Sequence, residues 1–446
     1  MRHSMPRQQQ SAPVPAEAKP AGEVRARWAW AEASVWTERM LTTLQQGVKG
    51  GRWYSLMDKV YSLRNLRAAF ARVKANRGAA GVDHQTLEMF ERRLEPKLER
   101  LQRSLRDGTY RPSALRRVWI PKPGRREKRP LGIPTVRDRV VQAALRNVLE
   151  PIFERDFAEH SYGFRPGRGC MDALRRVHRL LRAGYVYVVD ADMEAYFDCI
   201  PHERLLARVA EKVADGKLLA LVQALLQQEV LEAAKRWRPE EGTPQGAVIS
   251  PLLANIYLDP LDQLMAREGF RMVRYADDFV ILCRTQQEAE QALQTVQRWA
   301  AAAGLSVHPD KTSIVDESQR GGFDFLGYHF ERGYRWACRK SEGKLRQAIR
   351  AKTRRTEGRS LAAIISDVNR TLVGWFAYFQ YSHHTTFPRL DGYVRMRLRS
   401  ILCKRRGGRG RGRTRDHVRW PNAFFAAHGL FSLTTAYALA RQPAKR

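Results

Sequence analysis

Two acidic residues at the centre of an apolar segment are the residues of this chain best suited to chemistry. Asp277 and Asp278 stand side by side between two runs of β-forming residues, 272–275 and 279–282. This pattern predicts a strand, a tight turn and a second strand, with both carboxylates at the turn. Adjacent carboxylates repel each other unless water, basic side chains or a divalent cation offsets their charge. An exposed Asp-Asp turn is the simpler alternative, because Asp is a common turn residue.

A second acidic segment favours the cation. The apolar run 185–189 leads directly into Asp190 and Asp192, and Asp198 follows soon after. Carboxylates at the ends of two buried strands suit Mg²⁺, which takes oxygen ligands and keeps positions open for water and phosphate oxygens. Two such ions about 3.5 to 4 Å apart clamp the attacking and leaving oxygens of an in-line phosphoryl displacement. The expected chemistry is therefore nucleotidyl transfer with two Mg²⁺ ions, for which Mn²⁺ can substitute.

The motifs around these acids form a larger set. The sequence reads Asp-Met-Glu-Ala-Tyr-Phe-Asp at 192–198, Tyr-Ala-Asp-Asp at 275–278, Pro-Gln-Gly at 244–246, Ser-Pro-Leu-Leu-Ala-Asn at 250–255 and Gly-Trp-Phe-Ala-Tyr-Phe at 374–379. This set resembles the reverse transcriptases encoded by bacterial group II introns, from about residue 35 to the end. The resemblance implies a right-handed polymerase fold of the α/β class, with fingers, a palm sheet that carries the carboxylates, and a mostly helical thumb or maturase region.

The resemblance also implies a role for each matching residue near the incoming nucleotide. Asp192, Asp277 and Asp278 are the expected catalytic residues and metal ligands, with Asp278 in a supporting position. Lys122 and Arg129 are expected to contact the triphosphate, and Gln245 to lie near the nascent base pair. Phe197 is expected beneath the sugar, where a bulky ring excludes ribonucleotides.

Further residues are candidates for contacts with template and primer. Arg165 is one of them, and a structural salt bridge is its alternative. Lys311 is expected to contact a backbone phosphate, although it is also suited to protonate the pyrophosphate leaving group. The turn that holds the primer end in the family matches four consecutive residues, namely Phe325, Leu326, Gly327 and Tyr328.

Charge and composition indicate a polyanionic partner. The 446 residues include 79 Lys and Arg against 46 Asp and Glu, a formal net charge of +33. Such an excess favours nucleic acid, and the absence of a long apolar run or a signal-peptide pattern argues against a membrane. The five cysteines form no Cys-x-x-Cys pair, which agrees with a reducing compartment such as the bacterial cytoplasm. The expected partners are an RNA template, the intron RNA, a DNA primer or target, and dNTPs.

We expect five regions along the chain. A partly disordered N-terminal leader spans 1–55, the N-terminal extension and fingers 56–182, and the palm 183–335. A helical thumb or maturase bundle spans 336–403, because basic and apolar residues alternate there at helical spacing. A basic nucleic-acid-binding tail follows at 404–446, where Lys and Arg are interspersed with glycine.

The predicted function is that of an RNA-directed DNA polymerase of a group II intron, which also assists splicing and mobility of its intron RNA. No His- and Cys-rich endonuclease motif follows the thumb region, as in class C intron proteins. One alternative is a domesticated enzyme in phage defence or repair. The other is a splicing-only, RNA-binding maturase, which would gain nothing from unpaired acids in a basic groove.

Overall fold

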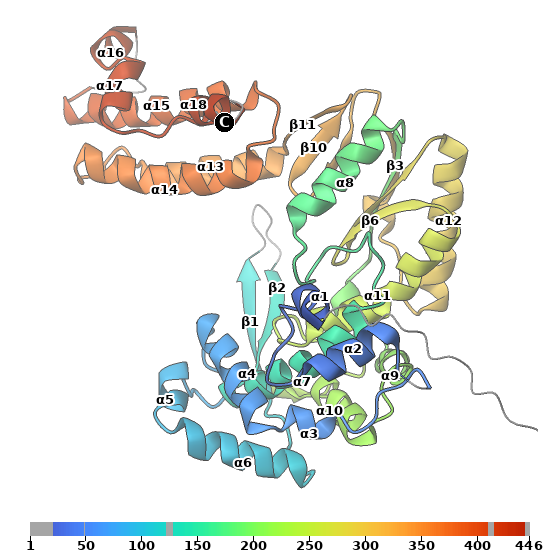
Figure 1. Cartoon of the computed structure of the whole chain (residues 1–446). Helices are drawn as coiled ribbons and strands as arrows, with labels where there is room; N and C mark the ends of the chain where they lie inside the picture. Colours follow the sequence, from blue (N-terminus) through green and yellow to red (C-terminus); the bar gives the residue numbers. More distant parts are fainter. Residues whose placement is uncertain (1–20, 49, 122–127, 409–413, 442–446) are drawn as a thin grey trace, which may run out of the picture.

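The computed structural model describes residues 21–48, 50–121, 128–408 and 414–441. Figure 1 shows the N-terminal helices below a central sheet, with the C-terminal helices projecting to one side at the top. The predicted triphosphate residue Lys122 and the predicted leader up to residue 20 lie outside the described residues.

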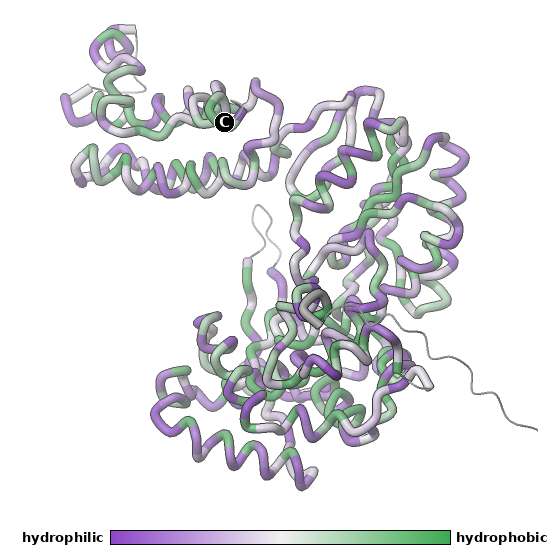
Figure 2. Tube along the Cα trace, in the orientation of Figure 1, coloured by the Kyte–Doolittle hydropathy of each residue, from purple (hydrophilic) through white to green (hydrophobic). Residues whose placement is uncertain are grey.

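The central sheet is antiparallel and has the strand order β6-β7-β3-β8. Its strands are β3 (Tyr187–Asp192), β6 (Arg271–Tyr275), β7 (Asp278–Cys283) and β8 (Ser313–Asp316). Figure 2 shows these strands mostly in hydrophobic colours, which fits burial on both faces. The strand predicted at 185–189 and the strand, turn and strand predicted around Asp277 are confirmed.

Helices cover both faces of this sheet. On one face, Val189, Phe279 and Ile281 join the main core, together with the helices α11 (Ser250–Arg267) and α12 (Gln286–Ala302). On the other face, Val188 and Val280 pack with α8 (Cys170–Arg182). The alternation of side chains along each strand therefore divides the palm between two apolar clusters.

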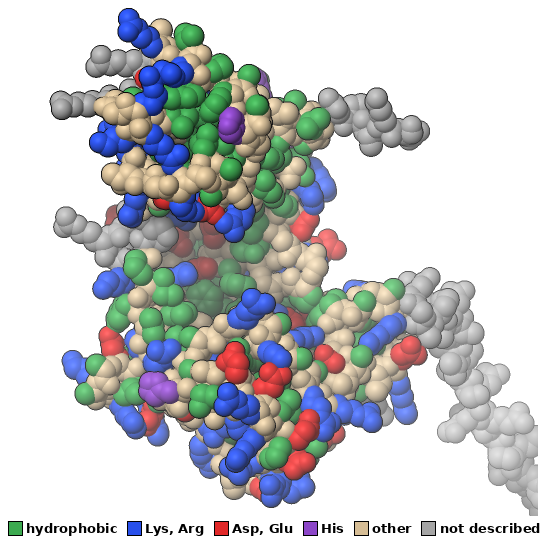
Figure 3. All heavy atoms as spheres, turned by 90° about the vertical axis from the view of Figure 1, so that its left-hand side faces the viewer, with side chains coloured by type: hydrophobic (Ala, Val, Ile, Leu, Met, Phe, Trp, Pro, Cys, Tyr) green, Lys and Arg blue, Asp and Glu red, His purple; other side chains and the backbone are tan. Residues whose placement is uncertain are grey.

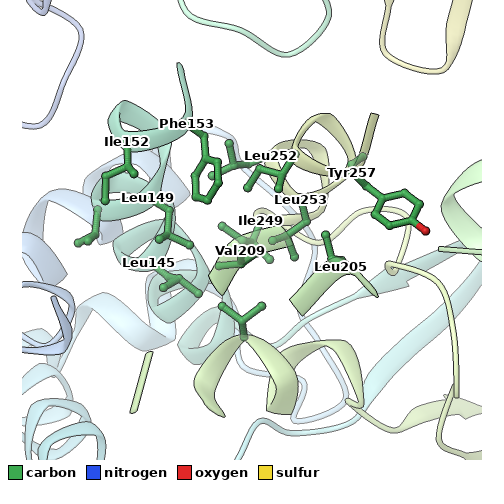
Figure 4. Close-up of a cluster of buried hydrophobic side chains, with 14 of the residues drawn as sticks. Leu145, Leu149, Ile152, Phe153, Leu205, Val209, Ile249, Leu252, Leu253 and Tyr257 are labelled. Carbon is green, nitrogen blue, oxygen red and sulfur yellow. The ribbon is translucent and has the colours of Figure 1, made fainter. Parts of the chain in front are cut away.

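The main core continues into the N-terminal half of the chain. Figure 4 shows α7 (Val136–Glu154) packing its buried side chains against α9 (His202–Ala210) and α11. The other helices of this half are α1 (Ala21–Arg27), α2 (Glu38–Gln46), α3 (Met57–Val60), α4 (Leu63–Ala75), α5 (Leu87–Glu91), α6 (Leu94–Arg106) and α10 (Gly216–Leu226). Trp28, Trp36 and Leu41 are buried in the same core, so part of the segment predicted as a leader is packed.

A second sheet stands beside this core and has the order β2-β1-β4-β5. It consists of β1 (Leu115–Pro121), β2 (Lys128–Ile133), β4 (Val230–Glu232) and β5 (Lys235–Trp237). The antiparallel pairing of β1 with β2 confirms the predicted hairpin, whereas β1 and β4 pair in parallel. No sequence pattern predicts β4 and β5, because three residues each are too few to show the alternation of a strand.

A three-stranded sheet links the central sheet to the C-terminal helices. Its strands are β9 (Phe323–Phe325), β10 (Tyr328–Glu331) and β11 (Tyr334–Ala337), and the helices are α13 (Arg339–Lys352), α14 (Leu361–Phe379), α15 (Thr386–Arg405), α16 (Thr414–Arg419), α17 (Asn422–Ala427) and α18 (Leu433–Ala440). Trp420, Phe425 and Leu433 are buried in one apolar cluster with α13, α14 and α15. Apolar contacts therefore connect the residues on either side of position 403. The domain boundary predicted there stays a prediction.

The segment before α8 lies directly against the turn between β6 and β7. The Tyr162 N–H donates to the Arg274 carbonyl at 2.9 Å, and the Arg274 N–H donates to the His160 carbonyl at 2.9 Å. A Cβ added at Gly163 would lie 2.1 Å from the backbone nitrogen of Ala276. Only glycine allows the two backbones to approach so closely.

We expect Gly163→Ala to destabilise the protein by about 1 to 3 kcal/mol, because the added methyl group forces two backbone segments apart. The matched control is Gly216→Ala at the start of α10, where an added Cβ meets nothing within 4 Å. Urea unfolding measures both variants. Equal unfolding midpoints for Gly163→Ala and the unsubstituted protein would contradict the close approach.

Candidate active site

The turn between β6 and β7 contains two residues. Tyr275 and Asp278 form the last pair of the ladder, which leaves Ala276 and Asp277 in the turn. Ala276 has a φ of 60°, in the left-handed region where glycine is usual. Positive φ at the first of two turn residues is typical of a type II′ hairpin turn. An alanine in this conformation costs on the order of 1 kcal/mol or more, so surrounding contacts must hold the turn.

Those contacts come from the guanidinium of Arg274, which is fully buried beneath the turn. Its Nε lies 2.8 and 3.1 Å from the two carboxylate oxygens of Asp262 on α11, and its Nη2 also donates to Asp262. Its Nη1 donates to Asn255 Oδ1 at 3.0 Å and to the Ala276 carbonyl at 2.8 Å. One side chain therefore ties the strained residue to the helix behind the sheet.

The register of the central sheet brings the predicted carboxylates together. Asp192 on β3 lies directly opposite Asp278 on β7, so both side chains leave the same face of the sheet. Asp190 lies two residues earlier on β3 and shares that face. Asp277 follows in the turn and is close enough to Asp192 for their charges to interact.

These carboxyl groups carry more negative charge than their protein neighbours offset. Burial, followed by the charges of Asp190, Asp277 and Asp192, raises the pKa of Asp278 to about 7. Burial also raises the pKa of Asp190 to about 7, with Asp324 and Asp192 adding to the effect. A bound divalent cation would oppose these shifts, so the donor set fits a metal of the Mg²⁺ type.

Lys311 forms an ion pair with Asp192. Its Nζ lies 2.6 Å from Asp192 Oδ2, and the pair is partly exposed. Within the stretches that the structure describes, no three His, Cys, Asp or Glu side chains converge as metal ligands would. The ion pair occupies one oxygen of Asp192. Lys311, predicted to contact a phosphate or to act as an acid, is thus placed in the acidic cluster.

The residues predicted to contact the nucleotide lie next to one another. Phe197 belongs to a short 3-10 helix, Tyr196–Asp198, and its carbonyl accepts from the Thr243 N–H at 2.6 Å. Gln245 Nε2 donates to Asp198 Oδ2 at 3.2 Å. Arg129 is exposed on β2, opposite Ile120 of β1. The structure therefore brings Phe197 and Gln245 to the same place and leaves Arg129 on the adjoining hairpin.

Arg165 faces inward. Its side chain is only 2% exposed, and its Nη2 lies 2.8 Å from Glu154 Oε1, while Nη1 donates to the carbonyl of Ser161 at 2.8 Å. This geometry matches the structural salt bridge that was the alternative for this residue. A template contact by Arg165 would require the buried pair to open.

The four residues predicted to hold the primer end form the turn between β9 and β10. Leu326 and Gly327 have φ values of 48° and 82°, the pattern of a type I′ turn. Phe325 and Tyr328 are buried below it. The Tyr378 hydroxyl of α14 donates to the Leu326 carbonyl at 2.8 Å, and the Tyr328 hydroxyl donates to the Tyr378 carbonyl at 2.6 Å. The turn therefore anchors the first long C-terminal helix to the palm.

Comparison with known proteins agrees with this architecture. The family model "Reverse transcriptase (RNA-dependent DNA polymerase)" matches residues 120–330, and "Group II intron, maturase-specific domain" matches residues 343–420. Protein YkfC of Escherichia coli (strain K12) is 33% identical over 291 residues, which cover 56% of this chain and 76% of YkfC. The chain belongs to the group II intron reverse transcriptase and maturase family.

The other matches cover a smaller share of the related protein. The group II intron-encoded protein LtrA of Lactococcus lactis subsp. cremoris is 39% identical over 199 residues, 44% of this chain and 33% of LtrA. This reverse transcriptase therefore matches about a third of LtrA. Among solved structures, the partial Cas6-RT-Cas1--Cas2 complex is 28% identical with a TM-score of 0.37, covering 56% of this chain and 41% of that one.

Family membership establishes the predicted function at the level of the family. The chain is a group II intron reverse transcriptase and maturase, with the mixed α/β fold of reverse transcriptases and a helical C-terminal maturase region. Reverse transcriptases generally use divalent metal ions, and the two regions imply binding of a nucleic-acid template and of intron RNA. No described helix is long and apolar enough to cross a membrane.

We expect Arg274→Met to destabilise this reverse transcriptase by about 3 to 5 kcal/mol, because Asp262 would remain as a buried, unpaired charge. The double variant Arg274→Met, Asp262→Leu should recover much of that loss, since it removes both charges. Urea unfolding of the two single variants and the double variant gives the coupling energy. Additive effects of the two substitutions would contradict a direct buried ion pair.

Proposed function

We propose that Asp192, Asp277 and Asp278 carry the polymerase chemistry of this reverse transcriptase, with two Mg²⁺ ions as cofactors. The observation that supports this assignment is the register that sets Asp192 opposite Asp278, with Asp277 in the adjoining turn. The raised pKa values of Asp277 and Asp278, caused first by burial, indicate that the site accommodates additional positive charge.

In this proposal, each residue has a defined task. When bound, the ions activate the primer 3′-hydroxyl and hold the triphosphate oxygens. Asp192 and Asp277 would hold the ions, and Asp278 would support the site from the strand opposite Asp192. Phe197 lies beneath the sugar of the dNTP and Gln245 beside its base. Lys122 and Arg129 contact the triphosphate from the β1–β2 hairpin.

We further propose that the substrates are an RNA template and a DNA primer, and that the protein also binds the intron RNA during splicing and mobility in the bacterial cytoplasm. The net charge of +33 supports a polyanionic partner. Figure 3 shows Lys and Arg side chains on the upper and lower parts of one face, on either side of a hollowed region. The turn at Leu326 and Gly327 is suitably placed to hold the primer end, because it adjoins both palm and α14.

The experiment that tests the metal assignment is Asp277→Ala. We expect no detectable primer extension, with affinity for RNA within a few fold of the unsubstituted protein, because basic side chains supply that affinity. Asp107→Ala, at an exposed site at the end of α6, is the acidic control and should extend primers normally. Substantial extension by Asp277→Ala would show that the carboxylate set is assigned wrongly.

Lys311→Met tests whether the ammonium group competes with a cation for Asp192. Methionine keeps much of the length of lysine without its charge. Because the ion pair is partly exposed, we expect Mn²⁺ to bind about two- to fivefold more tightly in the variant. Free Mn²⁺ is measured by electron paramagnetic resonance, with the exposed Lys340→Met as control. Unchanged Mn²⁺ affinity together with lost primer extension would instead favour the phosphate contact or the acid role.

Phe197→Ala tests the proposed sugar gate. Phe197 is only partly buried, and its ring centroid lies 5.5 Å from that of Tyr196. We expect the folded variant to incorporate rNTPs far more readily relative to dNTPs, because truncation leaves room for the 2′-hydroxyl. Single-nucleotide incorporation kinetics give the ratio. A purely structural side chain would lower the free energy of unfolding and leave that ratio unchanged, which would refute the gate.

A further inference from the structure

One face of the β2-β1-β4-β5 sheet carries two exposed tryptophans with an arginine between them. Trp119 on β1 is 45% exposed and Trp237 on β5 is 38% exposed. The guanidinium carbon of Arg117 lies 5.9 Å from the ring centroid of Trp119 and 5.4 Å from that of Trp237. We call Trp119, Arg117 and Trp237 the indole platform.

Strand register explains why these side chains share a face. Leu115, Val230 and Trp237 lie opposite one another across β1, β4 and β5. Arg117 and Trp119 are two and four residues after Leu115, so their side chains leave the sheet on the same side. Leu115 and Val230 are buried, whereas Trp237 at the edge strand and Trp119 further along β1 are exposed. The indoles are therefore exposed by their position and not by a disordered loop.

Contacts within the sheet hold the indoles in place and leave ring surface open. The Trp119 indole N–H donates to Glu232 Oε1 at 2.5 Å. On the β2 side, the residues opposite Trp119 and Arg117 are Pro130 and Gly132, which place no long side chain over the platform. Single exposed apolar residues are normal on a protein surface, but two fixed indoles on either side of an arginine are not.

The chemistry of this surface fits unpaired nucleotides. Bases stack on aromatic rings and on guanidinium planes whatever their sequence, and sheet faces with spaced aromatic residues bind single strands in this way. Lys235 is exposed two residues before Trp237 on β5, so it shares the face of the platform and is suited to contact phosphates. A duplex offers no such base faces, because its bases are already stacked on one another.

The platform also adjoins the proposed nucleotide site. Gly132, the β2 partner of Arg117, donates its N–H to the Gln245 carbonyl at 2.8 Å. Burial raises the pKa of Asp198, and the charge of Arg117 opposes this effect, so the two side chains are close. Asp198 in turn accepts a hydrogen bond from Gln245.

We propose that the indole platform binds the unpaired template strand ahead of the polymerase site by stacking of its bases on Trp119 and Trp237. This inference rests on the proposed function, because it needs a template that passes Gln245. The strand behind the site is paired with the product, so only the strand ahead of it offers free base faces. The platform would thus increase affinity for templates with a long 5′ overhang.

The experiment measures binding of the full-length protein to primer-template duplexes without dNTPs. The 5′ overhang is either one or about ten nucleotides long, and its bases are either present or replaced by abasic sites. The variants are Trp119→Ala, Trp237→Ala and the double substitution, with the exposed Tyr54→Ala as aromatic control. Fluorescence anisotropy over a range of salt concentrations gives each Kd and its salt slope.

The unsubstituted protein should bind the long overhang at least about tenfold more tightly than the short or abasic one. The double variant should lose that advantage while keeping its salt slope, because phosphate contacts remain. The Asp277→Ala protein should retain the advantage, which separates this proposal from the metal assignment. Equal binding of abasic and base-containing overhangs by the unsubstituted protein would overturn the proposal, even if a variant failed to fold. The proposal would also be overturned if the tryptophan variants lost affinity for a free single strand but bound primer-template duplexes with no dependence on the length of the overhang.

Discussion

The buried ion pair between Arg274 and Asp262 is the interaction on which the site depends. It lies beneath a turn whose first residue, Ala276, is held at a φ of 60°. A buried pair of this kind adds little net stability, because removing both charges from water costs about as much as their attraction returns. Its contribution is geometric. The Arg274 guanidinium donates hydrogen bonds to Asp262 and Asn255 on α11 and to the carbonyl of Ala276, and so it holds the strained turn residue in place relative to α11. The position of Asp277 is consequently set from behind the sheet and not by the acids themselves.

The charge of the whole molecule and the charge of the site are opposite in sign. The chain carries a net charge of +33, yet one face of the palm sheet gathers Asp190, Asp192 and Asp278 at partly buried positions. Burial, with repulsion between neighbouring carboxylates adding to it, raises the pKa of Asp278 and Asp190 to about 7. Lys311 pairs with Asp192 but not with these two carboxyl groups in the described contacts. The arrangement becomes favourable when further cations enter. A basic body that attracts nucleic acid and an acidic centre that requires cations are thus complementary parts of one polymerase.

Much of this structure could be predicted from the sequence, because the relevant signals are local. The β6–β7 hairpin follows from two β-forming runs around Asp277 and Asp278, and the palm carboxylates follow from motif spacing. Asp190 was visible too, since it precedes Asp192 by two residues and so shares its face, although it was not included among the predicted site residues. The roles of these residues stay predictions until they are tested by substitution.

Long-range contacts could not be predicted from the sequence. Nothing local indicates that Arg165 pairs with Glu154, or that Asp262 is the partner of Arg274, because partners on separate elements leave no periodic trace. The same reason explains why the sequence did not indicate that Trp420 and Leu433 are buried in one apolar cluster with α13, α14 and α15. Residues that look alike as a basic or apolar pattern are assigned to surface or core only when the elements are packed.

The two sheets are joined at the point where template, nucleotide and metal must meet. The loop of Gln245 accepts a backbone hydrogen bond from Gly132 of the β1–β2 hairpin and holds Asp198 of the palm through its side chain. A movement of the hairpin toward a bound triphosphate would therefore shift Gln245 and Phe197, although the hairpin would not contact Phe197 directly. Trp119, which lies on the same hairpin, would be carried with it. In the proposed arrangement, a template strand stacked on Trp119 would contact the hairpin whose Gly132 donates to the Gln245 carbonyl, and it would thereby influence the position of Gln245 beside the proposed nascent base pair.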